Sequence, residues 1–555
     1  MSSSRKSGRV SRRNFIATAT AGLGALAAMR DGLAQGNPKG AGAGKPAAEG
    51  AGEGASGTSG WKFGPFDTLR EYIEELDDRG LLLRVGRVDQ DAYEGTALMY
   101  RLVDTFGVYE APAVLFEKLK VDGNWMDGPV IANPFGHWST EAITFGIDPI
   151  VGNGRATYRA AIARVQELMV KGAFPLLPPL EVSRSAAPCK QVVLRGDAID
   201  LTKFAFVQTN PADAGRYVNT GSVFTTDTEL GNNFGTYRCQ IKGPRKLGVN
   251  PEPGQGGWRM FMKKKERGDK VAHVSIVLGQ DPITWVVSSS KLARGQPDEL
   301  ALAGGIRGKP LQVVRSETND MLIPALCELV IEGTVPLDQP MLPEGPFGEM
   351  YGYMGLKKDE NFWMDVTCIT HRKNPWLVNS ITGLTRGFPT APLETMSIVA
   401  MRRFYPNILE IHSPVEATGL TFVRIDKNRA GQGLEIGKKI AEIIPIAKVV
   451  VVVDKDIDVL NRTQVMHALG SRWQAQPATA IIPKLRGMPL DPSLTDRPNT
   501  SKAIIDATKQ WPEEGGPQVY PDLNIALLEK LAPDAFASVD ANWKKLVGDY
   551  RPPGR

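Results

Sequence analysis

Two glutamates and the turn between them are the first residues in this chain that suggest chemistry. The segment LPEGPFGEMYGY, residues 342–353, holds Glu344 and Glu349 five positions apart, on either side of Gly-Pro-Phe-Gly. Residues on one helix face are three or four apart and those on one strand face are an even number apart, so this spacing fits neither element. Pro346 also excludes a regular helix. The segment therefore predicts a rigid turn with a carboxylate at each end.

Further polar residues lie in two other segments of the middle region. GNNFGTYRCQ, residues 231–240, carries Asn233 and Arg238, and PDELALAGGIRGKP, residues 297–310, carries Glu299. Each residue alone is typical of a surface strand or a solvated turn. Together with the two glutamates they supply one arginine and three carboxylates, and a buried arginine needs such partners.

The common catalytic and metal-binding patterns are absent from the sequence. It has five histidines, with no His-x-x-x-His or His-Glu-x-x-His pair and no Gly-x-Ser-x-Gly turn. Its four cysteines are far apart and irregularly spaced, which gives neither a zinc pattern nor a disulfide framework. We interpret them as buried structural thiols.

Length and composition describe an ordinary globular protein. The 555 residues are enough for two to four domains of about 150 residues each. Apolar residues make up 42% and charged residues 23% of the chain. The net charge of +5 is small for this length, and the basic residues form no strong cluster, which argues against a nucleic-acid partner.

The first sixty residues predict export. Residues 1–35 contain Arg12 and Arg13, followed by x-Phe-Ile and a short Ala/Gly-rich apolar run, which is typical of a twin-arginine (Tat) signal peptide. Residues 36–60 are rich in Gly, Ala and Ser and read as a flexible linker. The predicted localisation is periplasmic, with the Tat translocase as a partner. Because that route carries folded proteins, the signal also predicts a cofactor inserted before export.

The remaining chain predicts a mixed α/β (α+β) fold in three parts. Residues 61–187 alternate helical and strand patterns, for example in a helix with i, i+3, i+4, i+7 periodicity within 66–86 and an amphipathic helix over 157–172. Residues 188–388 hold many short β-branched runs with turns between them, which predict a barrel or sandwich. Residues 389–555 return to helices, with an Ala-Lys-Val-Val-Val-Val-Val run that suits a buried parallel strand, and end in a Pro-rich tail expected to be irregular.

The chain resembles the UbiD family of decarboxylases over about Phe66 to Trp511. No single segment is specific enough to indicate the family, but ten segments that match it in the same order along the chain are. In chain order, the matching segments are LREYIEELDDRG, PVIANPFG, NNFGTYRCQ, VSIVLGQDP, DELALAGGIRG, ELVIEGTV, PEGPFGEMYGY, VVDKDIDVLNRTQVMHALGSRWQ, MPLDPS and SKAIIDATK.

The resemblance implies a cofactor and a catalytic trio. The cofactor would be prenylated FMN, and the central part would be a split β-barrel of the flavin reductase, FMN-binding type. By motif, Arg238 matches the family's active-site arginine, Glu344 the glutamate that pairs with it, and Glu349 the proton donor. An arginine presents a planar fork suited to a carboxylate, and a glutamate kept protonated in an apolar pocket can act as a general acid.

The resemblance also implies a metal site beside the cofactor phosphate. A divalent ion, Mn²⁺ or Mg²⁺, and potassium would bridge the phosphate, with Asn233 and Glu299 as two ligands. The family's third ligand is a histidine, and this sequence has Gly256 at the expected place. Mg²⁺ readily keeps water ligands, so a site without the imidazole is one outcome and Gln255 as a substitute ligand is another.

The same resemblance implies further cofactor contacts and partners. Thr236, Gln255 and Lys502 are expected at the cofactor, with Lys502 near the phosphate. Expected partners are a small-molecule carboxylic acid and a UbiX-type flavin prenyltransferase, and the expected assembly is a homodimer or homohexamer. Residues 383–394 are expected to line the substrate pocket. A flavin-dependent oxidoreductase and a non-enzymatic flavin-binding exported protein stay open as alternatives.

Overall fold

The structure is a computed structural model that describes residues 61–290, 292, 298–384, 386–548 and 550. The predicted signal peptide and linker, including Arg12 and Arg13, lie outside the described residues. Among the helices in the described part, none has the length and hydrophobicity that crossing a membrane requires.

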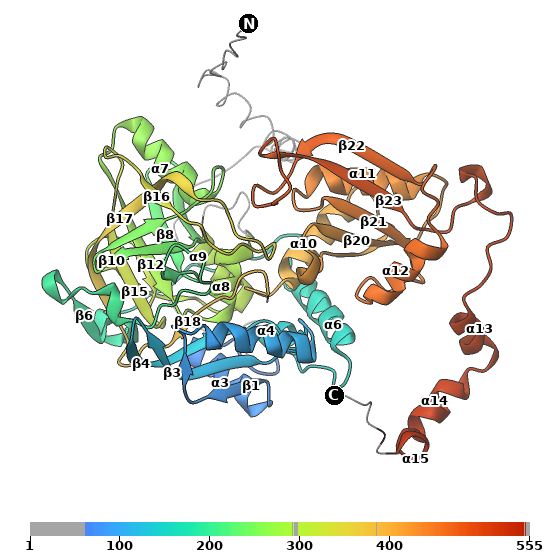
Figure 1. The fold of residues 1–555 in the computed structure, drawn as a ribbon, viewed down its shortest axis with the longest axis horizontal. Coiled ribbons are helices and arrows are strands. Elements are labelled where there is room, and N and C mark those ends of the chain that lie inside the picture. Colours follow the sequence, from blue (N-terminus) through green and yellow to red (C-terminus); the bar gives the residue numbers. More distant parts are fainter. Residues whose placement is uncertain (1–60, 291, 293–297, 385, 549, 551–555) are drawn as a thin grey trace, which may run out of the picture.

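The N-terminal region is built on a five-stranded mixed sheet (Figure 1). Helix α3 buries Leu69, Tyr72, Ile73 and Leu76, which is the predicted helical periodicity, and its N-cap Thr68 accepts a hydrogen bond from the Glu71 amide. The strand order is β1-β3-β4-β18, with β2 beside β3. The bounds are α3 Leu69–Asp78, β1 Leu82–Val85, β2 Val88–Asp89, α4 Glu94–Phe106, β3 Ala113–Val121, β4 Asn124–Ala132, α5 Trp138–Thr144, α6 Gly154–Glu167 and β18 Leu377–Val378.

One predicted helix boundary in this region was wrong. The helix expected over 157–172 is α6, which begins at Gly154 and ends at Glu167. Asn153 caps its start by accepting a hydrogen bond from the Ala156 amide, and Val170 forms an isolated bridge with Ala173 beyond its end. That bridge uses backbone groups that a longer helix would need.

The central region is a ten-stranded sheet. Its path is β7-β10-β11-β17-β15-β12-β8-β9, with β6 and β16 also paired to β17. The strands are β6 Val192–Leu194, β7 Tyr217–Val218, β8 Ser222–Asp227, β9 Gly231–Thr236, β10 Cys239–Gly243, β11 Lys246–Val249, β12 Val271–Leu278, β15 Leu329–Pro336, β16 Leu342–Glu344 and β17 Lys358–His371. A small sheet holds β5 Leu180–Glu181, β13 Gln312–Arg315 and β14 Leu322–Pro324, and the helices are α7 Gly256–Arg267, α8 Pro282–Ser290 and α9 Glu299–Arg307.

The ten-stranded sheet is curled but not closed. Strand β9 is the last on its path and β10 is the second, yet only Tyr237 and Arg238 separate the two strands along the chain. Two residues span only about 7 Å when extended, so the two ends of the sheet must approach one another. Arg238 therefore lies at the seam between the sheet's two ends. The helices and sheets of the structure confirm the predicted mixed α/β class.

The C-terminal region is a second α/β unit. Its sheet has the order β19-β20-β21-β23-β22, and the all-valine segment of β21 runs parallel to both neighbours, as the sequence predicts. Helices α6 and α10 pack together between this unit and the central one (Figure 1). The bounds are α10 Ala391–Arg402, β19 Ile408–His412, β20 Leu420–Ile425, α11 Gln432–Ile443, β21 Val449–Asp454, α12 Arg462–Ser471, β22 Thr479–Arg486 and β23 Asn499–Asp506.

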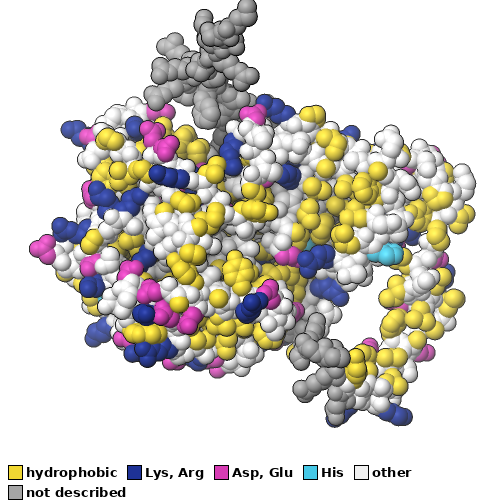
Figure 2. All heavy atoms as spheres, viewed as in Figure 1, with side chains coloured by type: hydrophobic (Ala, Val, Ile, Leu, Met, Phe, Trp, Pro, Cys, Tyr) yellow, Lys and Arg dark blue, Asp and Glu magenta, His cyan; other side chains and the backbone are white. Residues whose placement is uncertain are grey.

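The C-terminal tail, expected to be irregular, instead forms three short helices. They are α13 Asn524–Leu531, α14 Asp534–Ala541 and α15 Trp543–Val547, and none of their residues is buried. The segment extends away from the body as an arm (Figure 1), and hydrophobic side chains lie along it (Figure 2). Pro533 separates α13 from α14 and prevents one continuous helix there.

Candidate active site

Arg238 joins the two glutamates of the 342–353 segment. Its Nε donates to Glu344 Oε1 at 2.8 Å and its Nη2 to Glu344 Oε2 at 2.7 Å, a bidentate pair. Its Nη1 donates to Glu349 Oε1. One guanidinium thus contacts both carboxylates, and the three side chains that the sequence predicts to act together do meet.

The turn between the glutamates is anchored at several backbone atoms. Glu344 is the last residue of β16. Beyond it, the Pro346 carbonyl accepts from the Ala214 amide at 2.8 Å and the Gly348 amide donates to Asp213 Oδ1 at 2.9 Å. The Gly348 carbonyl accepts from Thr382 Oγ1 at 2.6 Å. These contacts hold the turn against two other segments, so both carboxylates have defined positions.

The trio is shielded from water. The side chains of Arg238, Glu344 and Glu349 are 8%, 0% and 10% exposed. Burial alone would lower the pKa of Arg238, but the hydrogen bonds and charges of the two glutamates outweigh it and raise that pKa. Burial raises the pKa of Glu349 by more than the attraction of Arg238 lowers it. Arg238 therefore stays cationic, and Glu349 holds a proton more readily than an exposed glutamate does.

Asn233 and Glu299 come together near the start of α7. Glu299 Oε2 accepts from the Phe234 amide, next to Asn233. Glu299 is the first residue of α9 and Asn233 lies on β9, so a helix and the edge of the curled sheet supply the two groups. The structure brings together the two predicted metal ligands.

Gly256 leaves no room for the expected histidine. A Cβ on Gly256 would lie 1.7 Å from Asn233 Oδ1, which is far inside contact distance. The space that an imidazole would need is filled by the Asn233 amide itself. A histidine at position 256 would therefore require the Asn233 side chain to take another position.

The atoms at this corner fit a cation and an anion bound together. Asn233 Nδ2 is buried without a hydrogen-bond partner among the described residues. Burial raises the pKa of Glu299 to about 7, as expected for a carboxylate that lacks a neighbouring cation. Within the described residues no three His, Cys, Asp or Glu side chains converge on a metal position. A metal here would need Asn233, Glu299 and ligands from outside the protein.

Two other residues predicted to contact the cofactor, Thr236 and Gln255, already have hydrogen-bond partners within the protein. Thr236 Oγ1 lies 2.9 Å from Ser288 Oγ, close in sequence to Arg238. Gln255 Oε1 accepts from the Glu252 amide at 2.8 Å, so its oxygen already has a local partner. Gln255 would have to give up this hydrogen bond in order to bind a metal through the same lone pair of Oε1.

Lys502 does not point toward the other predicted residues. Its Nζ donates to the carbonyls of Ala441 at 2.7 Å, Ile444 at 3.0 Å and Pro445 at 3.2 Å, at the end of α11. The residue is 1% exposed, and burial lowers its pKa to about 8. The ammonium therefore caps a helix inside the C-terminal unit, and its expected contact with a phosphate stays a prediction.

Sequence reasoning missed several supporting residues. The Tyr217 hydroxyl donates to Glu344 Oε1 at 3.2 Å, and the Arg238 guanidinium lies over the Phe347 ring, 5.2 Å from its centroid. The Tyr237 hydroxyl accepts from the Gly257 amide at 3.0 Å. Sequence adjacency could have indicated Tyr237, beside Arg238, and Phe347, between the glutamates. It could not have indicated Tyr217, which lies 127 residues before Glu344 in the chain.

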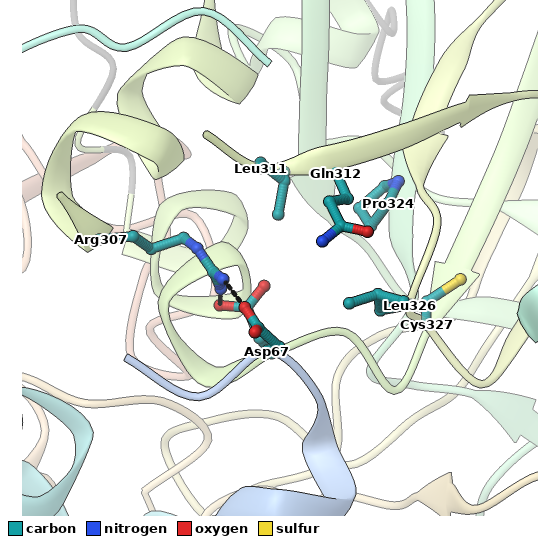
Figure 3. Close-up of a pocket in the computed structure, with 8 residues that line it drawn as sticks. Asp67, Arg307, Leu311, Gln312, Pro324, Leu326 and Cys327 are labelled. Carbon is teal, nitrogen blue, oxygen red and sulfur yellow. Dashed lines mark hydrogen bonds and ion pairs between the residues drawn. The ribbon is translucent and has the colours of Figure 1, made fainter. Parts of the chain in front are cut away.

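Two cavities lie away from the trio. One of about 10 Å³ is lined by Asp67, Arg307 and Cys327 among others (Figure 3), and Arg307 is ion-paired there with Asp67 and with Asp281. Its volume suits a single water molecule. A second, of about 180 Å³, lies between α6, α10 and β19. Neither is lined by Arg238, Glu344 or Glu349.

The sequence of this chain matches the profiles of a known enzyme family and several known proteins. Residues 180–385 match the sequence profile of the 3-octaprenyl-4-hydroxybenzoate carboxy-lyase Rift-related domain, and residues 389–507 match that of the corresponding C-terminal domain. An uncharacterised protein of Archaeoglobus fulgidus is 31% identical over 494 residues, covering 87% of this chain and 98% of its own. A phenolic acid decarboxylase of Sedimentibacter hydroxybenzoicus is 30% identical over 474 residues, covering 82% and 94%.

Solved structures agree with the sequence matches. The vanillic acid decarboxylase of Sedimentibacter hydroxybenzoicus in its closed form superposes with a TM-score of 0.71 at 26% identity, covering 88% of this chain and 100% of the other. The UbiD-class enzyme HmfF of Pelotomaculum thermopropionicum, in complex with FMN, superposes with a TM-score of 0.70 at 26% identity, covering 84% and 99%.

Proposed function

Because this chain belongs to the UbiD family of carboxy-lyases, we propose that it catalyses the reversible, non-oxidative decarboxylation of an aromatic or α,β-unsaturated carboxylic acid with prenylated FMN. The observation that carries the proposal is the single buried guanidinium held by both Glu344 and Glu349. Relatives named as a phenolic acid decarboxylase and a vanillic acid decarboxylase favour aromatic acids as the first substrates to test.

Arg238 is proposed to recognise the substrate carboxylate. Its bidentate pairing with Glu344 fixes the plane of the guanidinium at the sheet seam. Its third contact, Nη1 to Glu349, is the one that can be exchanged, because Glu349 retains some exposure whereas Glu344 has none. An entering carboxylate could take that position while Glu344 keeps the arginine oriented.

Glu349 is proposed to deliver the proton that replaces CO2. The raised pKa of Glu349 keeps a proton available, and its place at the far end of the anchored turn holds that proton at a defined position. In the carboxylation direction the same carboxylate would remove the proton. Hydride transfer needs no such acid beside an arginine, and this difference favours decarboxylation over a flavin-dependent oxidoreductase.

The residues near the start of α7 are proposed to hold the cofactor's phosphate end. Asn233 and Glu299 would bind Mn²⁺ or Mg²⁺, with potassium as a further ion, and Thr236 lies along the same path toward Arg238. When bound, prenylated FMN would supply an electron sink for the carbon that loses CO2. A UbiX-type flavin prenyltransferase would provide the cofactor, and the assembly would be a homodimer or homohexamer.

The proposed function is tested with protein co-expressed with a flavin prenyltransferase. Mass and absorbance spectra should show prenylated FMN, and a panel of aromatic and α,β-unsaturated acids should yield CO2 and the shortened product. Flavin binding with substrate-dependent flavin reduction but no CO2 would favour the oxidoreductase. Flavin binding without any turnover across the panel would favour the non-enzymatic alternative.

Replacing Glu299 should weaken metal-bridged cofactor binding. Glu299→Gln removes an anionic ligand while keeping the shape, so the purified protein should hold less divalent metal and less flavin. Elemental analysis and flavin absorbance measure both quantities. Glu266→Gln, an exposed position on α7, is the matched control. Full metal and flavin content in Glu299→Gln would exclude Glu299 as a ligand.

Export through the Tat route is proposed and can be tested by conservative changes. Arg12→Lys together with Arg13→Lys should leave folded precursor in the cytoplasm, because the Tat receptor reads the arginine pair and not the charge alone. Fractionation followed by immunoblotting measures the periplasmic share. Arg5→Lys with Arg9→Lys changes two nearby arginines outside the pair and should export normally. Equal periplasmic yields for the two double variants would remove the Tat assignment.

A further inference from the structure

A carboxylate outside the trio contacts the turn that carries Glu349. Asp213 lies in the segment that leads into β7, and its Oδ1 accepts from the Gly348 amide at 2.9 Å. Gly348 is the residue directly before Glu349. Asp213 is only 5% exposed, so this hydrogen bond is shielded from water and is stronger than the same bond would be at the surface.

The segment around Asp213 contacts the turn along most of its length. Three further contacts join residues 213–217 to the turn, namely the Ala214 amide to the Pro346 carbonyl at 2.8 Å, the Tyr217 ring to the Phe347 ring at 4.3 Å between centroids, and the Tyr217 hydroxyl to Glu344 Oε1 at 3.2 Å. Among these four contacts, the one from Asp213 is the nearest in sequence to Glu349. Asp213 is therefore the member of the segment best placed to fix that glutamate.

The partners of Asp213 require a carboxylate at this position. Its Oδ2 accepts from the Asn210 amide and from Thr209 Oγ1, both at 2.9 Å, while Oδ1 accepts from the Gly348 amide. Both oxygens thus face backbone N–H groups, which can only donate. An asparagine side chain of the same shape would have to turn its NH2 group toward one of these two amides, and the hydrogen bond there would be lost.

The backbone next to Glu349 is held from several sides. Asp213 accepts from the Gly348 amide, and Thr382 Oγ1 donates to the Gly348 carbonyl at 2.6 Å. The Glu349 amide donates to the Tyr353 carbonyl at 2.9 Å. With these backbone atoms fixed, the position of the Glu349 carboxyl group depends only on its own side-chain torsions.

We propose that Asp213 is a positioning residue for proton delivery, because its hold on the Gly348 amide places the Glu349 carboxyl group where it can protonate the carbon that loses CO2. This inference rests on the proposed function, which assigns the proton to Glu349. The side chain of Asp213 bonds to Thr209, Asn210 and Gly348, so it acts through the backbone of the turn. A displacement of about 1 Å at a reacting group can cost about a hundredfold in rate, which makes such an anchor important for turnover.

The first experiment measures steady-state kinetics of the holoenzyme. Asp213→Asn should lower kcat about ten- to a hundredfold, because Glu349 is no longer held in place. KM for the acid and the content of prenylated FMN should stay nearly unchanged, since Arg238 keeps its bidentate contact with Glu344. A wild-type kcat in Asp213→Asn would overturn the proposal.

A nearby aspartate provides the matched control. Asp200 Oδ1 accepts from the Thr202 amide at 2.9 Å and from Thr202 Oγ1 at 2.5 Å, which is a local turn of the same kind thirteen residues earlier in the chain. Asp200→Asn makes the same chemical change without touching the anchor of Gly348. Its kcat and KM should equal those of wild type, and an equal loss of kcat in both variants would also overturn the proposal.

A double-mutant cycle shows whether Asp213 acts through Glu349. In the Glu349→Gln background the proton donor is already absent, so adding Asp213→Asn should cause no further loss of turnover. A residue that only stabilises the fold would instead lower turnover by the same factor in both backgrounds. Equal factors in the two backgrounds would therefore overturn the positioning role.

Amide hydrogen exchange tests the anchor without turnover. In the flavin-free full-length protein, the peptide that covers residues 342–353 should take up deuterium faster in Asp213→Asn than in wild type or Asp200→Asn, while peptides of the C-terminal unit should exchange as before. Faster exchange throughout Asp213→Asn would indicate general destabilisation and would overturn the proposal. A wild type that releases no CO2 from any acid would overturn the proposed function, whereas the exchange of this peptide would still decide whether Asp213 anchors the turn.

Discussion

Arg238→Ala is expected to abolish CO2 release completely. The change removes the group proposed to recognise the substrate carboxylate and leaves Glu344 fully buried without its bidentate partner. Breaking a buried ion pair by deleting one partner typically costs about 3–5 kcal/mol, so the free energy of unfolding should also fall. Product analysis measures the first effect and urea unfolding of the flavin-free protein measures the second.

Two further variants separate the catalytic effect from the structural one. Arg245→Ala removes a half-exposed arginine in the turn between β10 and β11 and should leave both activity and stability nearly unchanged. Arg238→Met combined with Glu344→Gln removes both charges and should recover part of the lost stability without recovering activity. Turnover by Arg238→Ala above a few per cent of wild type would show that another group recognises the carboxylate.

Glu349→Gln is expected to lower turnover by about 10²–10⁴-fold, the range for losing a general acid. Flavin binding should be unaffected, because Glu349 contacts Arg238 and the turn and not the groups near α7. The variant keeps the shape of the side chain but cannot carry the proton. Steady-state kinetics measure turnover, and flavin absorbance measures cofactor content.

Isotope exchange distinguishes a proton donor from a structural residue. Wild type with the decarboxylated product in D2O should exchange the hydrogen at the carbon that carried CO2, and Glu349→Gln should not. Glu360→Gln, at an exposed position on β17, serves as the control and should exchange normally. Exchange at the wild-type rate in Glu349→Gln would exclude Glu349 as the donor and would leave it a structural partner of Arg238.

Local elements were predictable because their causes are local. The apolar spacing of α3 and the valine run of β21 both appear in the structure as the sequence indicates. Two local predictions were wrong, and both concern where a helix forms or ends. Helix α6 ends early where the backbone bridges Val170 to Ala173, and the tail forms short helices where only irregular chain was expected.

The candidate site was predictable only in part. Residue types and the ordered motifs indicated Arg238, Glu344 and Glu349, and the structure brings these three together. The same motifs indicated Lys502, which the structure turns toward the end of α11. A motif identifies a residue, but the direction of its side chain depends on which acceptors the surrounding fold leaves unsatisfied.

The sequence by itself determined the family, the alternation of helices and strands, and the anchored turn that carries two carboxylates. Only the tertiary structure decided that Arg238 stands at the seam of a curled sheet, within reach of glutamates 106 and 111 residues later. It also decided that the Asn233 side chain lies directly against Gly256. The physical reason is that periodicity and turn chemistry act over a few residues, whereas these contacts join segments that meet only when the sheet curls and the units pack.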